Sequence, residues 1–251
     1  MSKLDVSKYT IKDEKIDKNI KIIFLSDFHN NKKITNSLVK IIDQNKPDII
    51  IFGGDMINES LDKTDGFFEL LEKLKKYKTF YVFGNHEEAL NEEEFRIFRK
   101  KVNRTNVITL YNSYINISNN IKISGLVSEL DKYKKHKKLC LDRQYIISKI
   151  GNINKNKFNI LIAHNPLEFA SYVSYGSDLV LSGHVHGGLI KLPFLGALLS
   201  PDKSFFPKYF EGLYKKGHTK MIVSRGLGHS ERLKIRINNN FEVIIVELIK
   251  G

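Results

Sequence analysis

The sequence has almost no cysteine and no long apolar run. Cys140 is the single cysteine among 251 residues, which excludes a disulfide within the chain and fits a reducing compartment. Residues 1–19 carry charges without an apolar core, so we expect neither a secretory signal nor a membrane anchor there. No apolar run reaches the roughly 18 residues that a membrane-spanning helix requires. Together these absences predict a cytoplasmic location.

The chain also lacks a proline- or serine-rich linker, an internal repeat and any point at which the composition changes. Only five prolines occur, and 41% of the residues are hydrophobic and 27% charged, as is ordinary for a globular protein. A length of 251 residues fits one large α/β domain or two small ones. We therefore predict a single domain over residues 1–251.

Negative charge is scarce relative to positive charge. The 41 lysines and arginines exceed the 28 aspartates and glutamates by 13, which permits contact with nucleic acid or an anionic membrane. The excess is mostly lysine in a chain also rich in isoleucine and asparagine, so it reflects the general composition of the protein as much as a binding surface. The densest basic cluster, residues 131–143, is more typical of a solvated loop or helix face than of a nucleic-acid site. We predict no obligate nucleic-acid or protein partner.

Short apolar runs rich in β-branched residues recur along the chain, and each closes on glycine or a polar residue. Such runs predict strands, and they lie at 20–27, 48–55, 79–85, 158–164 and 178–184. Amphipathic stretches at 35–46 and 66–77 predict helices between the first three strands. Asn91 is a candidate N-cap for a further helix, because three glutamates follow it and suit the positive end of the helix dipole.

The pattern changes to short strands without helices over residues 106–127. A hairpin turn is predicted at Asn119–Asn120, and residues 219–228 and 241–249 again have strand character. Strands that alternate with helices indicate a parallel sheet whose strands are buried on both faces. Mixed parallel and antiparallel segments at this length predict an α/β fold, a four-layer αββα sandwich of two mixed β-sheets flanked by helices.

Polar residues of a particular kind end the five apolar runs. Ligands in open α/β sheets bind outside the carboxyl ends of the strands, so these residues are expected to gather along one edge. Five of the eight histidines fall there, together with two aspartates and an asparagine. These residues are Asp27, His29, Asp55, Asn85, His86, His164, His184 and His186.

Imidazole, carboxylate and amide groups without thiolates favour divalent ions such as Mn, Fe, Zn or Ni. Seven such ligands exceed the usual number for one ion, so two ions that share a bridging carboxylate fit better. Two ions about 3.5–4 Å apart clamp a phosphoryl group and supply a hydroxide for in-line attack. His184 and His186 stand two residues apart, and on extended chain such residues point the same way.

The order of these blocks resembles the calcineurin-like metallophosphoesterase superfamily. The blocks are Asp-x-His, Gly-Asp, Gly-Asn-His-Glu, His and Gly-His-x-His, and all five are present in sequence order from residue 27 to residue 188. Each block alone is weak evidence, whereas the ordered set is specific. The long spacing before His164 and the tail that follows the last block are similar to the bacterial YkuE/YaeI-type phosphodiesterases.

The resemblance implies a role for each matching residue. One ion would be held by Asp27, His29 and His186, the other by Asn85, His164 and His184, with Asp55 as the bridge. His86 would face the phosphate as a general acid rather than bind metal. The implied activity is hydrolysis of phosphoesters, phosphodiesters above all, by attack of a metal-bridging hydroxide, with manganese as the first candidate for both ions.

Other residues near the blocks have weaker assignments. Asn85, His86 and Arg225 are candidates for substrate contact, since a guanidinium pairs bidentately with phosphate; a structural role for Arg225 is equally open, as it is for His229. We expect Glu87 only to orient its turn or to face solvent. The glycines of the blocks are expected to permit tight turns and close approach of backbone to the site; these are Gly53, Gly54, Gly84, Gly183, Gly187 and Gly188.

Residues 187–217 combine aliphatic and aromatic residues with five lysines. Packing of this segment on the protein's own core is one explanation. Contact with a membrane–water interface is the other, which would add a peripheral location at the inner face of the membrane and a lipid-linked phosphoester as candidate substrate. The apolar and aromatic residues include Leu189, Phe194, Leu195, Phe205, Phe206 and Phe210, and the lysines are Lys191, Lys203, Lys208, Lys215 and Lys216.

Two alternative functions remain open. A metal-dependent nuclease on the same fold would agree with the positive charge, although it should also show a basic groove with aromatic stacking partners. A catalytically inactive binding scaffold would be expected to have lost metal ligands, and none is missing here.

Overall fold

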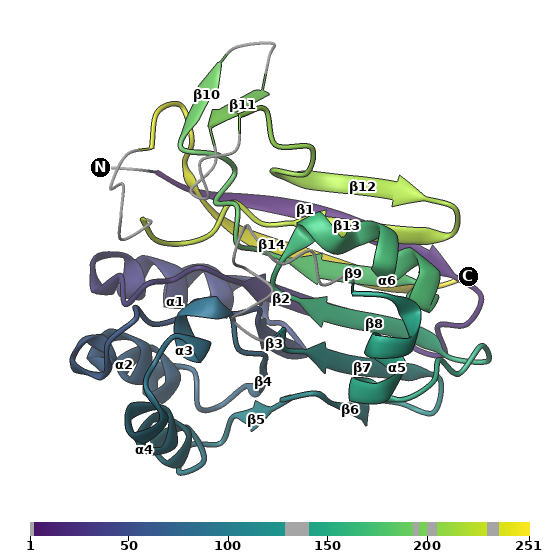
Figure 1. Ribbon diagram of the computed structural model, residues 1–251, viewed down its shortest axis with the longest axis horizontal. Coiled ribbons are helices and arrows are strands. Elements are labelled where there is room, and N and C mark those ends of the chain that lie inside the picture. The colour runs from purple at the N-terminus through teal and green to yellow at the C-terminus, as the bar shows by residue number, and fades with distance from the viewer. Residues whose placement is uncertain (1–2, 129–140, 193–195, 200–204, 230–235) are drawn as a thin grey trace.

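The computed structural model describes most of the chain (Figure 1). The described residues are 3–128, 141–192, 196–199, 205–229 and 236–251. Cys140, nearly all of the basic cluster at 131–143, and Phe194, Leu195 and Lys203 of the 187–217 segment lie outside them.

Six strands form the first sheet, in the spatial order β1-β14-β2-β3-β4-β5. The strands β2 to β5 pair in parallel, β14 runs antiparallel to β2, and β1 pairs in parallel with β14. Their bounds are β1 Leu4–Asp13, β2 Ile20–Leu25, β3 Ile49–Phe52, β4 Lys78–Tyr81, β5 Ile108–Thr109 and β14 Phe241–Lys250.

The second sheet also has six strands, in the order β12-β13-β9-β8-β7-β6. Its four central strands are parallel, and an antiparallel strand closes each edge. The bounds are β6 Ser113–Asn116, β7 Ile121–Leu126, β8 Phe158–Ala163, β9 Leu179–Ser182, β12 Gly212–Lys216 and β13 Thr219–Val223. A separate two-stranded sheet, β10 Ile190–Leu192 with β11 Gly196–Leu199, stands away from both (Figure 1).

Helices cover the outer faces of the two sheets (Figure 1). The helices α1 Thr35–Asn45, α2 Asp65–Lys73 and α4 Glu92–Val102 lie beside the first sheet, and α5 Arg143–Ile150 and α6 Phe169–Tyr175 lie beside the second. Short helical turns complete the described elements: η1 Lys32–Ile34, η2 Leu61–Lys63, α3 Asn85–Glu88 and η4 Pro166–Glu168. The arrangement confirms the predicted αββα sandwich.

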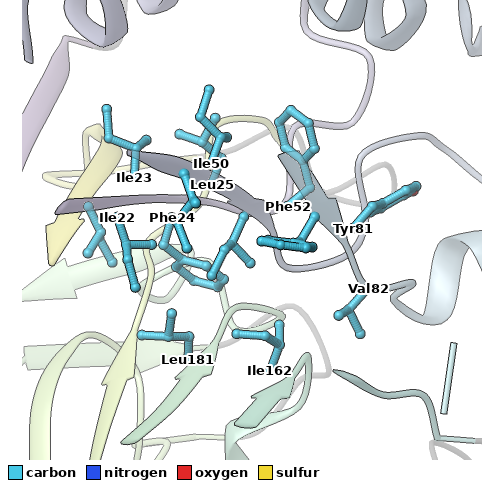
Figure 2. Close-up of a cluster of buried hydrophobic side chains, with 14 of the residues drawn as sticks. Ile22, Ile23, Phe24, Leu25, Ile50, Phe52, Tyr81, Val82, Ile162 and Leu181 are labelled. Carbon is cyan, nitrogen blue, oxygen red and sulfur yellow. The ribbon is translucent and has the colours of Figure 1, made fainter. Parts of the chain in front are cut away.

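The alternation of side chains along each strand divides the core into layers. On β2, Ile22 and Phe24 point toward Ile162 and Leu181 of the second sheet, whereas Ile23 points to the opposite face (Figure 2). On β8, Ile160 and Ile162 belong to this inter-sheet core, and Leu161 and Ala163 pack instead with the residues of α5 and α6. Strands buried on both faces must be apolar at every position, which is why the sequence shows them as continuous runs.

The sequence predicted these buried strands and the helices between them, and the structure confirms them. Asn91 caps α4 as expected, because its side chain accepts a hydrogen bond from the Glu94 N–H and Glu94 returns the contact. The elements that the sequence did not predict include the strands β1, β10, β11 and β12 and the helices α5 and α6. Strand β1 alternates exposed and half-buried residues and owes its place to ten paired positions on β14, a partner more than 200 residues away in sequence.

The fold brings the ends of five strands to one place. Strands β2, β3 and β4 are parallel neighbours in the first sheet, as are β8 and β9 in the second, and each is followed within a few residues by one of the polar blocks. The two sheets face each other, so these blocks meet between them.

Phe24 offers a test of the inter-sheet core, since its ring is fully buried between the sheets. Phe24→Ala should lower the free energy of unfolding by about 3–5 kcal/mol, through lost burial and the cavity that remains. Urea denaturation measures this change. The same substitution at Phe205, which is 71% exposed, is the control and should change stability by less than about 0.5 kcal/mol. Equal effects at the two positions would contradict the packing described here.

Candidate metal centre

Three overlapping groups of side chains come together where the five strands end. The groups are Asp27, His29 and His186; His29, Asp55 and His86; and Asp55, His164 and His184, and within each group the ligand atoms lie within 4.8 Å of one another. The centre is buried: Asp27 and Asp55 are at most 1% exposed and His29, His164 and His186 at most 7%. Six of the seven residues predicted as ligands thus fall into two of these groups.

The backbone conformation orients the carboxylates of Asp27 and Asp55. Asp27 and Asp55 both adopt left-handed φ angles, 51° and 54°, which non-glycine residues rarely do outside functional sites. The Asp27 carboxylate accepts a hydrogen bond from the His184 N–H at 3.0 Å, and Asp55 Oδ1 accepts one from the His86 N–H at 2.9 Å. Each carboxylate is therefore tied to the loop that carries the next ligand.

Hydrogen bonds also orient two of the imidazoles. His29 Nδ1 lies 3.2 Å from Asn58 Oδ1, and His164 Nδ1 lies 2.7 Å from the carbonyl oxygen of Gly53. Both partners are acceptors, so each Nδ1 carries a proton and each Nε2 is turned toward the centre, the orientation found in metal-binding histidines. The free nitrogens point into the centre: His29 Nε2 is 3.2 Å from His186 Nε2, and His164 Nε2 is 3.0 Å from Asp55 Oδ2.

The prediction that extended chain brings His184 and His186 together is wrong in its geometry. Strand β9 ends at Ser182, and the two histidines lie in a turn with left-handed φ angles of 72° and 54°. They contribute to different groups, His184 with Asp55 and His164, and His186 with Asp27 and His29. Gly183 permits this turn, because a Cβ there would lie 2.4 Å from Asp27 Oδ2.

The donors fit divalent cations. Asn85 Oδ1 is buried yet forms no hydrogen bond with any residue that the structure describes. A buried polar atom without a partner is costly. An amide oxygen, imidazole nitrogens and carboxylate oxygens that converge in this way suit an ion such as Mn, Fe or Zn.

Burial and neighbouring charges together set the pKa values of the candidate ligands. Burial lowers the pKa of His29 to about 3 and that of His186 well below its usual value, which keeps both rings in the neutral form that binds metal. Burial also opposes the charged form of His164, but Asp55 and Asp27 outweigh it and raise its pKa to about 10. Burial raises the pKa of Asp27 to about 6, while His164 and His86 overcome the same effect at Asp55 and hold its pKa well below the usual range.

His86 lies at the rim of this centre. Its Nε2 is 3.8 Å from Asp55 Oδ2, its Nδ1 is 3.8 Å from Glu59 Oε1, and its ring meets the His29 ring edge-on at 4.7 Å between centroids. Its side chain is 15% exposed, more than Asp55 beside it. The distances place His86 close enough to join a ligand group, so its separate role stays a prediction.

Glu87 is more important than the sequence suggested. It is fully buried, and its carboxylate accepts hydrogen bonds from four backbone N–H groups: Asp55 at 2.9 Å, Met56 at 2.7 Å, Ile57 at 3.2 Å and Gly84 at 2.7 Å. The structure confirms that Glu87 orients its turn, and it shows that Glu87 does not face solvent. The carboxylate joins the loop of Asp55 to the loop of Asn85 and His86. Gly84 allows this approach, since a Cβ there would lie 2.2 Å from Asp55 Oδ1.

The structure places Arg225 among carboxylates. Its guanidinium pairs with Asp5 at 3.2 Å and Glu242 at 3.3 Å and lies 3.8 Å from Glu211. These contacts favour the structural role that the sequence left open. A different arginine, Arg236, lies against a predicted ligand, with Nη2 3.1 Å from His186 Nδ1. Neither a motif nor a regular spacing marked Arg236, because its contact depends on how two distant loops fold.

Residues 187–217 divide between the two explanations offered for them. Leu189 and Ala197 are buried at 2% exposure, as expected of packing on the core, whereas Phe205 and Phe206 are 71% and 60% exposed. Lys191 forms an ion pair with Glu211. Across the described residues, none of the helices is both long and apolar enough to cross a membrane.

Comparison with known proteins agrees with this geometry. The family model of calcineurin-like phosphoesterases matches residues 20–188, the stretch that holds all five blocks. An uncharacterized metallophosphoesterase of Helicobacter pylori is 33% identical over 223 residues, covering 86% of this chain and 56% of that protein. The chain thus spans little more than half the length of this relative.

Two other relatives match over most of both chains. The uncharacterized metallophosphoesterase YkuE of Bacillus subtilis is 27% identical and covers 98% of this chain and 85% of its own. The phosphodiesterase YaeI of Escherichia coli is 26% identical and covers 91% and 82%. The buried groups of candidate metal ligands agree with the family match. The family match and these relatives show that the chain belongs to the calcineurin-like phosphoesterase family.

Proposed function

We propose that the protein is a metal-dependent phosphoesterase with two divalent ions, and that phosphodiesters are its preferred substrates. The convergence of two ligand groups in one buried centre carries this proposal. Asp27, His29 and His186 would hold one ion and Asn85, His164 and His184 the other. Asp55 would serve both, because one of its oxygens lies 3.0 Å from His164 Nε2 and its carboxylate also belongs to the group of His29.

The bound ions would supply Lewis acidity and an activated water for in-line attack on phosphorus. The chain's own contribution is a rigid set of oriented ligands. Asn58 and the Gly53 carbonyl fix the tautomers of His29 and His164, and Glu87 fixes the backbone that carries Asp55. Preorganised ligands need little rearrangement during the reaction, which is where much of the rate enhancement in such sites originates.

His86 is suited to protonate the leaving oxygen. It lies between Asp55 and Glu59 and its side chain is partly exposed, so it would lie beside a phosphate bound at the centre. Substrate contact by Asn85 and His86 belongs to this proposal. Contact by Arg225 has less support, since three carboxylates already surround its guanidinium.

Support for the finer assignments comes from chemistry and from one relative. The absence of thiolate from the ligand groups favours Mn over softer ions, with Fe, Zn or Ni as alternatives. YaeI is named a phosphodiesterase, which favours diesters over monoesters. The nuclease alternative is supported by the net charge of +13 and by a hollow of about 450 Å³ on α4, lined by Phe95, Arg96, Arg99, Lys100, Asn103 and Arg104. Single-stranded DNA therefore belongs among the test substrates.

Removal of metal should abolish activity. Treatment with EDTA should end the hydrolysis of bis-aryl phosphate, mono-aryl phosphate and cyclic nucleotides alike, and Mn²⁺ should restore it. Asp55→Asn should lose bound metal together with activity, because the bridging charge is removed. Elemental analysis and steady-state kinetics measure both quantities, and the exposed Asp62→Asn is the matched control. Full activity of a demonstrably metal-free preparation would disprove the proposal.

His86→Ala should separate catalysis from metal binding. We expect both ions to remain and kcat to fall by about 10²–10⁴, the usual contribution of a general acid. The loss should shrink for aryl esters with good leaving groups, which need less protonation. His218→Ala, at an exposed position, is the control. Loss of an ion from His86→Ala would show that His86 is a ligand instead.

We further propose that the exposed aromatic residues near β10 and β11 touch an anionic membrane and favour lipid-linked phosphoesters. Phe205 and Phe206 are exposed, and Lys215 and Lys216 on β12 are exposed as well. Lys191 contributes less, because Glu211 already neutralises it. The exposed lysines add about 1 kcal/mol each near anionic lipid, so the expected binding is peripheral and weak.

Vesicle binding tests this contact. Wild type should co-sediment with vesicles of phosphatidylserine and phosphatidylcholine and hydrolyse lipid-linked diesters faster than soluble ones. The double variant Phe205→Ser/Phe206→Ser should lose both properties, and Tyr114→Ser, which removes an aromatic residue that is 55% exposed on β6, should lose neither. Identical behaviour of wild type and the double variant would rule the contact out.

A further inference from the structure

The solvent-facing side of α4 carries a dense group of cations. The hollow of about 450 Å³ on this helix is lined by Phe95, Arg96, Arg99, Lys100, Asn103 and Arg104. Its four cationic side chains are exposed, and none of them forms an ion pair with a residue that the structure describes. The acidic residues of α4, Glu92–Glu94, all lie in its first turn. We call the surface formed by the six lining residues the α4 basic face.

This concentration of like charge works against the helix. Arg96 and Lys100 are four residues apart and thus neighbours on the helix surface, where like charges repel each other. The negative end of the helix dipole favours the cations of the last turn, Arg99, Lys100 and Lys101, but Arg96 lies a turn earlier. Binding of an anionic partner would offset the repulsion that the helix leaves uncompensated.

Two aromatic rings hold Arg99 in place. Its guanidinium lies 5.7 Å from the centroid of the Phe95 ring and 5.2 Å from that of the Tyr111 ring. The Tyr111 hydroxyl in turn donates a hydrogen bond to Glu88 at 3.2 Å, and the Phe95 ring packs edge-on against buried Phe83 at 5.8 Å. Because Arg99 and Phe95 both line the hollow, it offers a fixed guanidinium plane and an aromatic ring beside the cations. These are the groups on which the bases of single strands stack.

The composition of the α4 basic face distinguishes among anionic partners. An anionic membrane would also require exposed apolar side chains, and none of the large hydrophobic residues exposed in the described part of the chain lies on α4. Inorganic polyphosphate would use the cations but not the stacking groups. The rise between Arg96 and Lys100, about 6 Å along the helix axis, is close to the spacing of successive phosphates along an extended strand. Cations at this spacing beside stacking groups fit a nucleic-acid strand.

We propose that the α4 basic face binds single-stranded nucleic acid. Arg96, Lys100 and Arg104 contact phosphates, and Arg99 with Phe95 stacks a base. This binding goes beyond the proposed function and does not depend on it, since it requires neither bound metal nor hydrolysis. The face is also separate from the surface proposed to contact a membrane: α4 lies at the lower edge of Figure 1, and β10 and β11 lie at its upper edge.

Substitution of two cations tests the phosphate contacts. The probe is fluorescently labelled oligothymidylate of about 12 nucleotides, within the usual range of site sizes. Its binding is followed by fluorescence anisotropy in EDTA, which prevents metal-dependent hydrolysis. Three phosphate contacts at about 0.7 each predict that log K for wild type falls against log[salt] with a slope of about −2. Arg96→Gln/Lys100→Gln should reduce the slope to about −0.7 and weaken binding at least about tenfold at low salt.

The matched control for this variant is Lys8→Gln/Lys12→Gln. It removes the same charge at the same separation along the chain, from exposed positions on β1. Its affinity for the oligonucleotide should stay within about twofold of wild type, because surface charges more than a Debye length from the bound strand are largely screened. Equal weakening in the two double variants would show attraction by net charge alone and would overturn the inference.

Arg99→Lys separates stacking from charge, since lysine keeps the charge and lacks the guanidinium plane. Its affinity for oligothymidylate should fall about 5–20-fold with the salt slope unchanged, the loss expected for one stacked base. Circular dichroism confirms that the variants are folded. Should Arg99→Lys lose structure, an abasic strand of the same length tests stacking on wild type and should bind at least about fivefold more weakly than oligothymidylate.

Two further results would overturn the inference. One is the absence of oligonucleotide binding by wild type at low salt. The other is equal affinity of wild type for the abasic strand and for oligothymidylate, which would leave an anion site without base contact. Neither result touches the proposed function, because metal-dependent hydrolysis of bis-aryl phosphate is measured without nucleic acid.

Discussion

Two carboxylates, Asp27 and Asp55, are buried together between the ends of two sheets, and the surrounding structure serves to keep them there. Buried carboxylates are costly unless hydrogen bonds and opposite charges surround them. Asp27 accepts from the His184 N–H, Asp55 accepts from the His86 N–H, and the carboxylate of Asp55 lies 3.0 Å from His164 Nε2. Each of these interactions also brings a histidine into the centre.

The backbone around these carboxylates is held in conformations that an isolated chain would avoid. Asp27, Asp55, His184 and His186 all have left-handed φ angles. Such strain persists only where neighbouring contacts outweigh it. Glu87 supplies four of these contacts to the loops of Asp55 and Asn85, and Arg236 and Asn239 hold the turn of His186. The rigidity of the centre therefore comes from residues that would not touch a metal themselves.

Charge within the centre is distributed unevenly. His29 and His164 each have an oxygen behind the ring, and His186 has a guanidinium. The surroundings of each imidazole therefore depend on what lies behind the ring, which the residue types alone would not reveal.

The buried strands and the helices between them could be predicted because double burial imposes continuous apolar runs and amphipathic helices leave a periodic trace. The candidate ligands could be predicted for a related reason: their order at strand ends is a local pattern, and parallel strands bring such ends to one edge. Strand β1 could not, since its ten-residue pairing with β14 is a contact between the two ends of the chain.

The sequence by itself determined the layered architecture, the set of candidate ligands and the family, because these follow from composition and from spacing along the chain. Only the tertiary structure decided that His184 and His186 lie in a left-handed turn rather than on extended chain, and that Arg225 pairs with carboxylates while Arg236 meets His186. It also showed that the Glu87 carboxylate joins two loops through hydrogen bonds and does not only orient its own turn. These features depend on hydrogen bonds and charges between segments far apart in sequence, where no periodicity or motif connects the partners.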